Sequence, residues 1–475
     1  MKQIIKDQIS RLFAERFAEE ATRIDVFPAN GSYREYCRLS SNHYTVIGAW
    51  NADLRENEAF ISFSKHFKAQ GIPVPTIYAV NETGDCYLQE DLGTHTLFDF
   101  LTKTREVEGF SQRIIEAYKK VIQLLPQLQT QAAQNLDYSK CYPRPAFDKQ
   151  SMMWDLNYFK YYFLKLAKIA FDEQLLEDDF ERFTSYLLAT DTHYFLYRDF
   201  QSRNIMYNEG KVSFIDYQGG RKGALQYDLA SLLYDAKADI PQSVRAELLD
   251  FYLDELAKIQ QVDRTKFKSF FAGYVLIRIM QAMGAYGFRG FYEKKEHFLK
   301  SIPFALNNMS YILDSFEIPV EMPELMRVLK ELIHSKDLKS LAADKPKLTV
   351  NISSFSYKKG LPQDTSGNGG GFIFDCRAIH NPGRYEPYKK LTGRDTEVIE
   401  FLENKSEMPQ FMSHVYALVD QSVETYINRG FTGLCVNFGC TGGQHRSVYG
   451  AEQLAKHLSN NYDVELVLNH REQNF

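Results

Sequence analysis

Apolar residues change their spacing along the first ninety positions, from a helical period to short runs typical of strands. Phe60, Phe63 and Phe67 share one side of a predicted helix, which the Gly- and Pro-containing stretch 71–75 ends. The predicted elements are, in order, an amphipathic helix at 1–20, short strands joined by polar turns within 22–50, a helix at 56–70, and strands at 76–80 and 86–89. Together they predict a small lobe rich in β-strands.

The chain from residue 94 to about residue 337 has mainly helical spacing. The exception is the stretch 193–217, where two short apolar runs, 193–197 and 212–215, flank a polar loop. This part therefore predicts a large helical lobe with a loop-and-strand insertion. With the first lobe it predicts an α+β bilobal fold in which a β-rich N-lobe precedes a helical C-lobe.

Strand-like and helical segments alternate from Thr349 onward. The predicted strands lie at 349–356, 372–376, 433–437 and 464–468, and the predicted helices at 395–403, 411–428 and 448–459. This alternation predicts a separate α/β domain with a largely parallel sheet. We expect two domains, at 1–335 and 347–475, joined by a linker or helix end near 338–348.

The composition is that of an ordinary globular protein and excludes wholesale disorder. The 475 residues are 44% hydrophobic and 25% charged, and the formal net charge of −5 provides no overall cationic field for nucleic acid or anionic lipid. The six cysteines are scattered without zinc-like spacing, which indicates reduced thiols. No signal peptide or spanning apolar run is apparent, so the expected location is the cytoplasm and no membrane partner is expected.

Three polar residues around the loop near residue 200 have the spacing of a phosphotransfer site. Asn204 follows Asp199 by five positions, and Asp216 ends a short apolar run twelve positions later. Asp199 would accept the proton of an acceptor hydroxyl, while Asn204 and Asp216 would bind Mg²⁺ on the phosphates of ATP. Polar loop residues and a turn-capping Asp are the alternative, but the ordered set favours phosphotransfer.

The segments YRDFQSRN, FIDYQGG and YDLASLL resemble the catalytic motifs of the aminoglycoside-phosphotransferase-like kinases. The resemblance covers about residues 1–330 and implies a protein-kinase-like fold, with ATP and Mg²⁺ as cofactors. It also implies that Asp228 supports the catalytic loop. Further segments, such as EDLG at 90–93 and QAMGAYG at 281–287, resemble the anomeric amino-sugar kinases, which phosphorylate N-acetylmuramate and N-acetylglucosamine.

The resemblance assigns several residues to the nucleotide. They are Gly31, Ser32, Tyr33 and Arg34 in a phosphate-side turn, Gln89 and Asp91 in the inter-lobe hinge, and Glu58 as the helix carboxylate that pairs with a strand Lys. That Lys is missing, because the strand 44–50 contains none. Arg34 or Arg38 could meet the phosphate charge instead, or mainly Mg²⁺ and the backbone amides of the Gly31–Tyr33 turn could do so. A pseudokinase is the alternative. Tyr197 stands where the family often has His.

Three residues are candidates for contact with a sugar. Trp154 could stack on a sugar ring, Asp155 could bind its hydroxyls, and Arg278 is a weaker candidate. A core Trp beside a surface Asp, and a solvated helix Arg, are the plain alternatives.

A Gly-rich turn follows the predicted strand at 433–437 and precedes the last helix. Backbone N–H groups at such a helix start bind anions, and a His and an Arg add cationic donors. The candidate anion-binding residues are Cys440, Thr441, Gly442, Gly443, Gln444, His445, Arg446 and Ser447. A turn needed only for packing is one alternative. The C-x5-R spacing of Cys440 and Arg446 suggests another, a cysteine-dependent phosphatase.

The motifs SFSYKKGLP, FDCR, LTGRD and GCTGGQHRS resemble the C-terminal domain of the RNase adapter RapZ, over about residues 349–460. The resemblance implies binding of a sugar phosphate, such as glucosamine-6-phosphate, and contact with small RNA. Residues 347–475 contain 13 Lys plus Arg and 14 Asp plus Glu, a net of −1, which weakens the case for RNA.

These patterns predict an ATP- and Mg²⁺-dependent small-molecule kinase. Its expected acceptor is a hydroxyl of an amino sugar of the N-acetylmuramate or N-acetylglucosamine type, in cell-wall sugar recycling, and its C-terminal domain is expected to bind a sugar phosphate. The alternative is a non-catalytic nucleotide or sugar-phosphate sensor, or an RNA-associated regulatory adapter.

Overall fold

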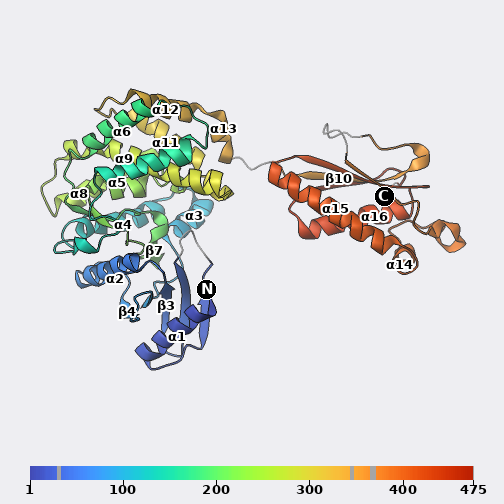
Figure 1. The fold of residues 1–475 in the computed structure, drawn as a ribbon, viewed down its shortest axis with the longest axis horizontal. Coiled ribbons are helices and arrows are strands. Elements are labelled where there is room, and N and C mark those ends of the chain that lie inside the picture. The colour runs from blue at the N-terminus through green and yellow to red at the C-terminus, as the bar shows by residue number, and fades with distance from the viewer. Residues whose placement is uncertain (29–33, 343–346, 364–370, 474–475) are drawn as a thin grey trace. The chain divides into compact units, whose positions relative to one another are not determined.

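The structure is a computed structural model that describes residues 1–28, 34–342, 347–363 and 371–473. The chain forms two compact units, Met1–Ala343 and Asp344–Phe475, each with its own hydrophobic core (Figure 1). Each unit is described by itself below. The predicted turn residues Gly31, Ser32 and Tyr33 lie outside the described residues.

The first unit begins with a five-stranded antiparallel sheet of order β1-β2-β3-β5-β4. Helix α1 packs on one face of the sheet through Ile9 and Phe13, and α2 packs on the other through Phe60 and Phe63. The elements are α1 (Gln3–Phe17), β1 (Arg23–Val26), β2 (Glu35–Ser40), β3 (Thr45–Trp50), α2 (Leu54–Ala69), β4 (Ile77–Val80) and β5 (Cys86–Glu90). Alternate strand positions thus serve two different cores, which is why the sheet is apolar on both faces.

A helical lobe forms the rest of this unit (Figure 1). Its long central helix α9 is almost entirely buried from Phe271 to Met283 and packs against α5, α7 and α11. The helices are α3 (Leu97–Glu108), α4 (Gln112–Gln129), α5 (Lys149–Phe159), α6 (Glu173–Leu187), α7 (Leu225–Leu233), α8 (Gln242–Ala257), α9 (Arg264–Tyr286), α10 (Glu296–Leu299), α11 (Ile302–Ser315), α12 (Pro323–His334) and α13 (Lys336–Lys339).

Two short antiparallel strand pairs carry the candidate site in this lobe. β6 (Tyr194–Leu196) pairs with β9 (Arg221–Gly223), and β7 (Ile205–Asn208) pairs with β8 (Lys211–Phe214). The loops that leave β6 and β8 contain Asp199 and Asp216, so the two pairs bring these loops together.

The second unit has a four-stranded sheet of order β11-β12-β10-β13, and all three strand pairings are parallel. The strands are β10 (Thr349–Ser356), β11 (Gly371–Asp375), β12 (Gly433–Cys440) and β13 (Glu465–His470), and the helices are α14 (Thr396–Asn404), α15 (Met408–Arg429) and α16 (Arg446–Asn461). The central strands β10 and β12 read as nearly continuous buried runs, as parallel strands do.

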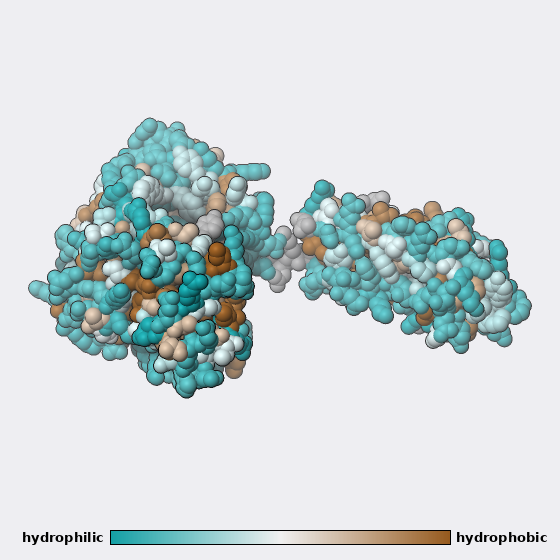
Figure 2. All heavy atoms as spheres, turned by 60° about the horizontal axis from the view of Figure 1, so that its bottom comes forward, coloured by the Kyte–Doolittle hydropathy of each residue, from teal (hydrophilic) through white to brown (hydrophobic). Residues whose placement is uncertain are grey.

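The predicted α+β bilobal protein-kinase-like fold with a separate α/β domain is confirmed. The pattern missed β7 and β9, because runs of three or four residues carry little periodicity. Hydrophilic side chains cover most of the face of each unit that Figure 2 shows, with smaller apolar patches between them. In the described part of the chain, no helix combines the length and apolar character needed to cross a membrane.

Candidate phosphotransfer site

The loop after β6 holds Asp199 and Asn204 close together through its own backbone. The side-chain amide Nδ2 of Asn204 donates to the carbonyl oxygen of Asp199 at 2.9 Å, and the carbonyl of Asn204 accepts from the N–H of Ile215 at 3.1 Å. Because the amide nitrogen is engaged, Oδ1 is the atom of Asn204 that a cation would use.

Asp228 contacts the start of this loop, which the family resemblance implies that it supports. Its buried carboxylate accepts from the backbone N–H groups of Tyr197 at 2.8 Å and Arg198 at 3.1 Å, and from Gln129 at 3.0 Å. Burial raises the pKa of Asp228 to about 7, and these three hydrogen bonds oppose the rise. Tyr197 is fully buried and donates its hydroxyl to the carbonyl of Ile215, so it ties the Asp199 loop to the Asp216 loop.

Asp216 follows β8 in a left-handed backbone conformation, with φ of 67°. Its carboxylate accepts from the amide of Gln218 at 2.7 Å. Burial raises the pKa of Asp216; the negative charge of Asp199 adds to this rise, whereas the Gln218 hydrogen bond and the charge of Arg34 oppose it. Two carboxylates therefore act on each other here, an arrangement that a bound cation would stabilise.

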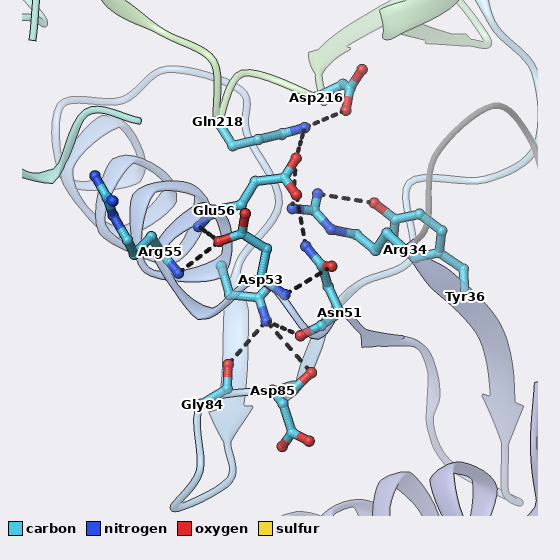
Figure 3. Close-up of polar contacts among 11 residues, drawn as sticks. Arg34, Tyr36, Asn51, Asp53, Arg55, Glu56, Gly84, Asp85, Asp216 and Gln218 are labelled. Carbon is cyan, nitrogen blue, oxygen red and sulfur yellow. Dashed lines mark hydrogen bonds and ion pairs between the residues drawn. The ribbon is translucent and has the colours of Figure 1, made fainter. Parts of the chain in front are cut away.

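Arg34 and Glu56 extend this site into the N-lobe (Figure 3). Gln218 donates to Glu56 at 3.3 Å, and Glu56 forms an ion pair of 3.4 Å with Arg34. Asn51, which follows β3, also donates to Glu56 at 2.7 Å. Polar contacts thus run from Asp216 through Gln218 and Glu56 to Arg34.

This network corrects the choice of Glu58 as the helix carboxylate. Glu58 lies on an exposed part of α2 and pairs with Lys140 at 2.5 Å. Glu56, two positions earlier, faces Arg34 and Gln218 instead. A shift of two residues turns a helical side chain by about 200°, which is why the sequence alone placed the wrong Glu on this face.

Arg34 lies on the side of the sheet that faces α2, with its guanidinium 5.7 Å from the centre of the Phe60 ring. Ala49 of β3 lies between Tyr36 and Tyr87 of the neighbouring strands, and all three side chains are turned toward α2. Arg34 lies against these tyrosines, with Nη1 at 3.4 Å from the hydroxyl of Tyr36. The small Ala49 side chain leaves room for a guanidinium that comes from the start of β2.

Arg38, the other candidate for the missing Lys, has a different partner. It forms a bidentate ion pair with Asp91 of the hinge at 2.6 and 3.0 Å. Gln89 lies opposite Ile47 in the sheet and is buried, and within the described residues its Oε1 has no hydrogen-bond partner. Between the two candidates, only Arg34 lies beside Asp216.

The three predicted sugar contacts lie in different environments. Asp155 forms a bidentate ion pair with Arg198 at 2.6 and 2.7 Å, so it positions the residue before Asp199 rather than facing an open space. Trp154 is 46% exposed, with the guanidinium of Arg144 over its ring. Arg278 is buried, which corrects its interpretation as a solvated helix residue.

A small cavity of about 20 Å³ lies beside the loop, which is room for about one water molecule and far less than a ligand site needs. Gln201, whose N–H donates to the carbonyl of Asp199, lines it together with Arg278. The other lining residues are Ser231, Tyr234, Asp235, Ala236, Ile279, Ala282, Tyr286 and Ala305. A larger cavity lies behind the hinge, between Leu92, α3 and the β7–β8 turn, but Asp199, Asn204 and Asp216 are not among its lining residues.

The Gly-rich loop of the second unit is also resolved, and most of its polar side chains turn inward. Arg446 is 4% exposed, and its Nη1 donates to the carbonyls of Arg377 at 2.9 Å and Ile379 at 2.7 Å. His445 lies 2.8 Å from the carbonyl of Tyr388, and Gln444 donates to that of Leu391 at 2.7 Å. The expected role of His445 and Arg446 as open cationic donors is therefore wrong for this conformation.

Cys440 receives hydrogen bonds at the start of α16. Its Sγ lies 3.2 Å from the N–H of Gly443, which has φ of 66°, and 3.2 Å from the hydroxyl of Ser447. Burial acts to raise the pKa of Cys440, but these hydrogen bonds and the charge of Arg446 bring it below its ordinary value. Thr441 and Gly442 are the exposed members of the loop.

Within the described residues, no three His, Cys, Asp or Glu side chains form a group that could hold a metal ion. Asn204 and Asp216 are one amide and one carboxylate. This donor set fits Mg²⁺, which is commonly held by one or two protein oxygens together with phosphates and waters.

Comparison with known proteins finds a family match in each of the two units. Residues 50–262 match the sequence model of the phosphotransferase enzyme family, and residues 348–474 match that of the RapZ C-terminal domain. A nucleotide-binding protein of Thermosipho africanus is 38% identical over 140 residues, or 30% of this chain and 48% of the relative. A nucleotide-binding protein of Nitrosomonas eutropha is 40% identical over 124 residues, which are 26% of this chain and 41% of the relative. The chain thus spans less than half the length of these relatives.

Two solved structures are similar at low identity. The first is choline kinase from Cryptosporidium parvum, with a TM-score of 0.47 and 12% identity; the match covers 69% of this chain and 99% of the kinase. The second is a thermostable mutant of an aminoglycoside phosphotransferase, with a TM-score of 0.41 and 11% identity; the match covers 65% of this chain and 99% of the phosphotransferase. The class of the chain follows from the family matches: a kinase-like domain followed by an α/β domain. The first matches the phosphotransferase enzyme family over residues 50–262, and the second matches the RapZ C-terminal domain over residues 348–474, as the sequence motifs indicated.

Proposed function

We propose that the first unit is an ATP- and Mg²⁺-dependent kinase that phosphorylates a hydroxyl of an amino sugar, in the recycling of cell-wall sugars. The observation that carries the proposal is the juxtaposition of Asp199, Asn204 and Asp216 on two loops tied together by Tyr197. Phosphoryl transfer needs mainly positioning and charge stabilisation, and these three side chains supply the groups for both.

Asp199 would accept a hydrogen bond from the acceptor hydroxyl and take its proton as the new bond to phosphorus forms. Asn204 and Asp216 would hold Mg²⁺, which supplies positive charge to the phosphate oxygens. Asp228 and Asp155 act through the loop: the first accepts its backbone N–H groups, and the second holds Arg198. Asp228 and Asp155 would thus hold Asp199 in place while the proton is transferred.

Arg34 would meet the negative charge of the nucleotide tail in place of a strand lysine. Its guanidinium lies beside Asp216 and is oriented by Glu56, as an ion pair orients the lysine of protein kinases. The buried Oε1 of Gln89 would accept from a purine amino group, which is a donor of the right kind. These contacts favour a catalytic site over the pseudokinase alternative.

The second unit is proposed to bind a small anion such as a sugar phosphate. The exposed backbone of Thr441 and Gly442 lies at the positive end of the 16-residue helix α16. Arg446 would act by holding the 377–379 segment rather than by gripping the anion. A sensor or RNA-associated adapter remains the second candidate, favoured by the match of residues 348–474 to the RapZ C-terminal domain.

The test is an ADP-release assay with ATP, Mg²⁺ and a panel of amino sugars. We expect sugar-dependent ADP release, and a loss of roughly 10²–10⁴-fold in kcat for Asp199→Asn, the usual contribution of a positioned base. Exposed Asp263→Asn, at the N-terminal cap of α9, is the matched control. Normal turnover in Asp199→Asn would remove this residue from its role.

A further inference from the structure

Two cysteines of the second unit lie opposite each other on neighbouring strands. The last pair of the parallel ladder between β11 and β12 is Asp375 with Gly439. The next residues along the two strands are Cys376 and Cys440. The N–H of Cys376 still donates to the carbonyl of Gly439 at 2.8 Å, so the backbone pairing continues and makes the two cysteines register partners.

The two cysteine side chains also share one face of the sheet. Side chains at every second position of a strand point to the same face. In β12, Val436, Phe438 and Cys440 all belong to the hydrophobic core of the second unit. In β11, Phe374 packs against Phe438 with ring centroids 5.5 Å apart, and Cys376, two positions further on, is buried in the same core. The two thiols therefore face the same core from adjacent strands.

The spacing of such partners suits a disulfide. Neighbouring strands lie roughly 4.7–4.9 Å apart, within the Cα separation of about 4.4–6.8 Å that disulfides span. At present the Sγ of Cys440 lies 3.2 Å from both the N–H of Gly443 and the hydroxyl of Ser447, so it must leave these contacts to turn toward Cys376. Because these contacts stabilise the reduced form, a disulfide at this place would be easy to reduce.

We propose that Cys376 and Cys440 form a reversible disulfide in the presence of hydrogen peroxide, and that this bond releases the Gly-rich loop from the sulfur of Cys440. That sulfur attacks one peroxide oxygen, the O–O bond breaks and hydroxide leaves, which gives a sulfenic acid. The sulfur of Cys376 then attacks the sulfenic sulfur, and its proton leaves with the hydroxyl group as water. Overall the two thiols lose two electrons and two protons, and the peroxide becomes two molecules of water.

Cys440 is the expected point of attack by the peroxide. Although burial opposes ionisation, the hydrogen bonds to its sulfur and the charge of Arg446 bring the pKa of Cys440 below its ordinary value. Cys440 directly precedes the exposed Thr441 and Gly442, where a small oxidant would enter. Burial raises the pKa of Cys376, which fits the thiol that reacts second. The disulfide depends on neither of the activities proposed above.

The test treats the folded full chain with hydrogen peroxide, alkylates the remaining thiols after unfolding, and maps all six cysteines by mass spectrometry. We expect two thiols to be lost, one linked pair of peptides that contains Cys376 and Cys440, and recovery of both thiols with dithiothreitol. The inference would be overturned if both residues stayed open to alkylation, or if Cys440 were overoxidised or linked to a different cysteine.

Variants separate the roles of the two thiols. Cys376→Ala should lose the linked pair and accumulate a sulfenic acid on Cys440, which dimedone traps, whereas Cys440→Ala should show neither product. Cys435→Ala, on the opposite face of β12, is the matched control and should form the same linked pair as the wild-type protein. If the control lost the linked pair, or Cys376→Ala gave no sulfenic acid, the assignment of the two thiols would be wrong.

Hydrogen exchange measures the effect of the disulfide on the Gly-rich loop. In the oxidised wild-type chain the N–H of Gly443 loses its sulfur acceptor, so we expect it to exchange roughly tenfold faster, the effect of one lost hydrogen bond. Reduction with dithiothreitol should restore the slower rate. An unchanged rate in a chain shown to carry the disulfide would contradict the proposed release of the loop.

Discussion

The catalytic loop of the first unit and the Gly-rich loop of the second unit use their charged side chains in opposite ways. In the first, neither Asp199 nor Asp216 forms an ion pair with any of the residues that the structure describes, and Arg34 and Gln218 only partly offset the charge of Asp216. In the second, Arg446 and His445 are turned into the protein and bond to backbone carbonyls. We infer that charged side chains without a balancing partner form a ligand site, whereas charged side chains that are hydrogen-bonded to carbonyls support the backbone.

The largest effect should follow from removal of one unbalanced charge. Asp216→Asn keeps the shape and removes the carboxylate that would bind Mg²⁺, so kcat should fall roughly 100-fold or more. The folded structure should keep its stability or gain some, because the buried negative charge is gone. Turnover and thermal unfolding, measured on the same preparation, check the predicted loss of kcat and the predicted unchanged or higher stability. If Asp216→Asn lost both activity and stability, the proposed difference between the two loops would be wrong.

The substitution Arg446→Met should lower the stability of the second unit. It leaves the carbonyls of Arg377 and Ile379 without their donor, at a cost of about 2–4 kcal/mol in the free energy of unfolding of the second unit. Exposed Lys390→Met is the matched control. Hydrogen exchange in β12 reports this unit, since both Trp residues lie in the first unit. If hydrogen exchange in β12 stayed as slow in Arg446→Met as in the wild-type protein, and only anion binding were lost, Arg446 would be a ligand-binding residue instead.

Asp228 is a buried charged residue of the first unit that contacts the backbone of the Asp199 loop, as Arg446 contacts backbone carbonyls in the second unit. Burial raises the pKa of Asp228 to about 7 from an ordinary value near 4, so the folded protein holds an extra proton between these pH values. This group therefore lowers the free energy of unfolding as pH rises from about 4 to about 7, by up to about 1.4 kcal/mol per pH unit. Asp228→Asn should flatten that slope in denaturant melts at pH 5 and 7.5. An equal slope in both proteins would argue against a protonated Asp228.

The smallest effect concerns the two arginines of the N-lobe. Arg34→Ala should raise KM for ATP by roughly tenfold, the effect of about 1.4 kcal/mol of lost interaction with the phosphates, while Arg34→Lys should recover part of it. Arg38→Ala should have a smaller effect, because Arg38 is engaged with Asp91 at the hinge. Equal effects from both alanine variants would place Arg34 among the purely structural residues.

The amino-acid sequence predicted the architecture because most elements are long and strongly periodic. The fixed spacing of Asp199, Asn204 and Asp216 predicted their roles, and the family resemblance implied that of Asp228; these roles stay predictions. The sequence failed where orientation decides: Glu56 and Glu58 lie on different sides of α2, and Arg446 points inward although its position in the motif suggests a ligand. Gln218 was missed, and its place two residues after Asp216 was the only available signal.

The burial of Arg278 could not be predicted either, because its partner Ser231 comes from a distant part of the chain. Only the packing of α9 against α7 brings Arg278 to Ser231 and to the cavity. Long-range packing of this kind leaves no trace in local periodicity.

The most direct test of the central claim follows the γ-phosphate of radiolabelled ATP to the amino sugar. With wild-type protein and Mg²⁺, we expect label on the sugar in proportion to ADP formed, and with Asp199→Asn we expect neither above background. Label that remains on ATP in the wild-type protein, or that transfers equally well in the variant, would contradict the account.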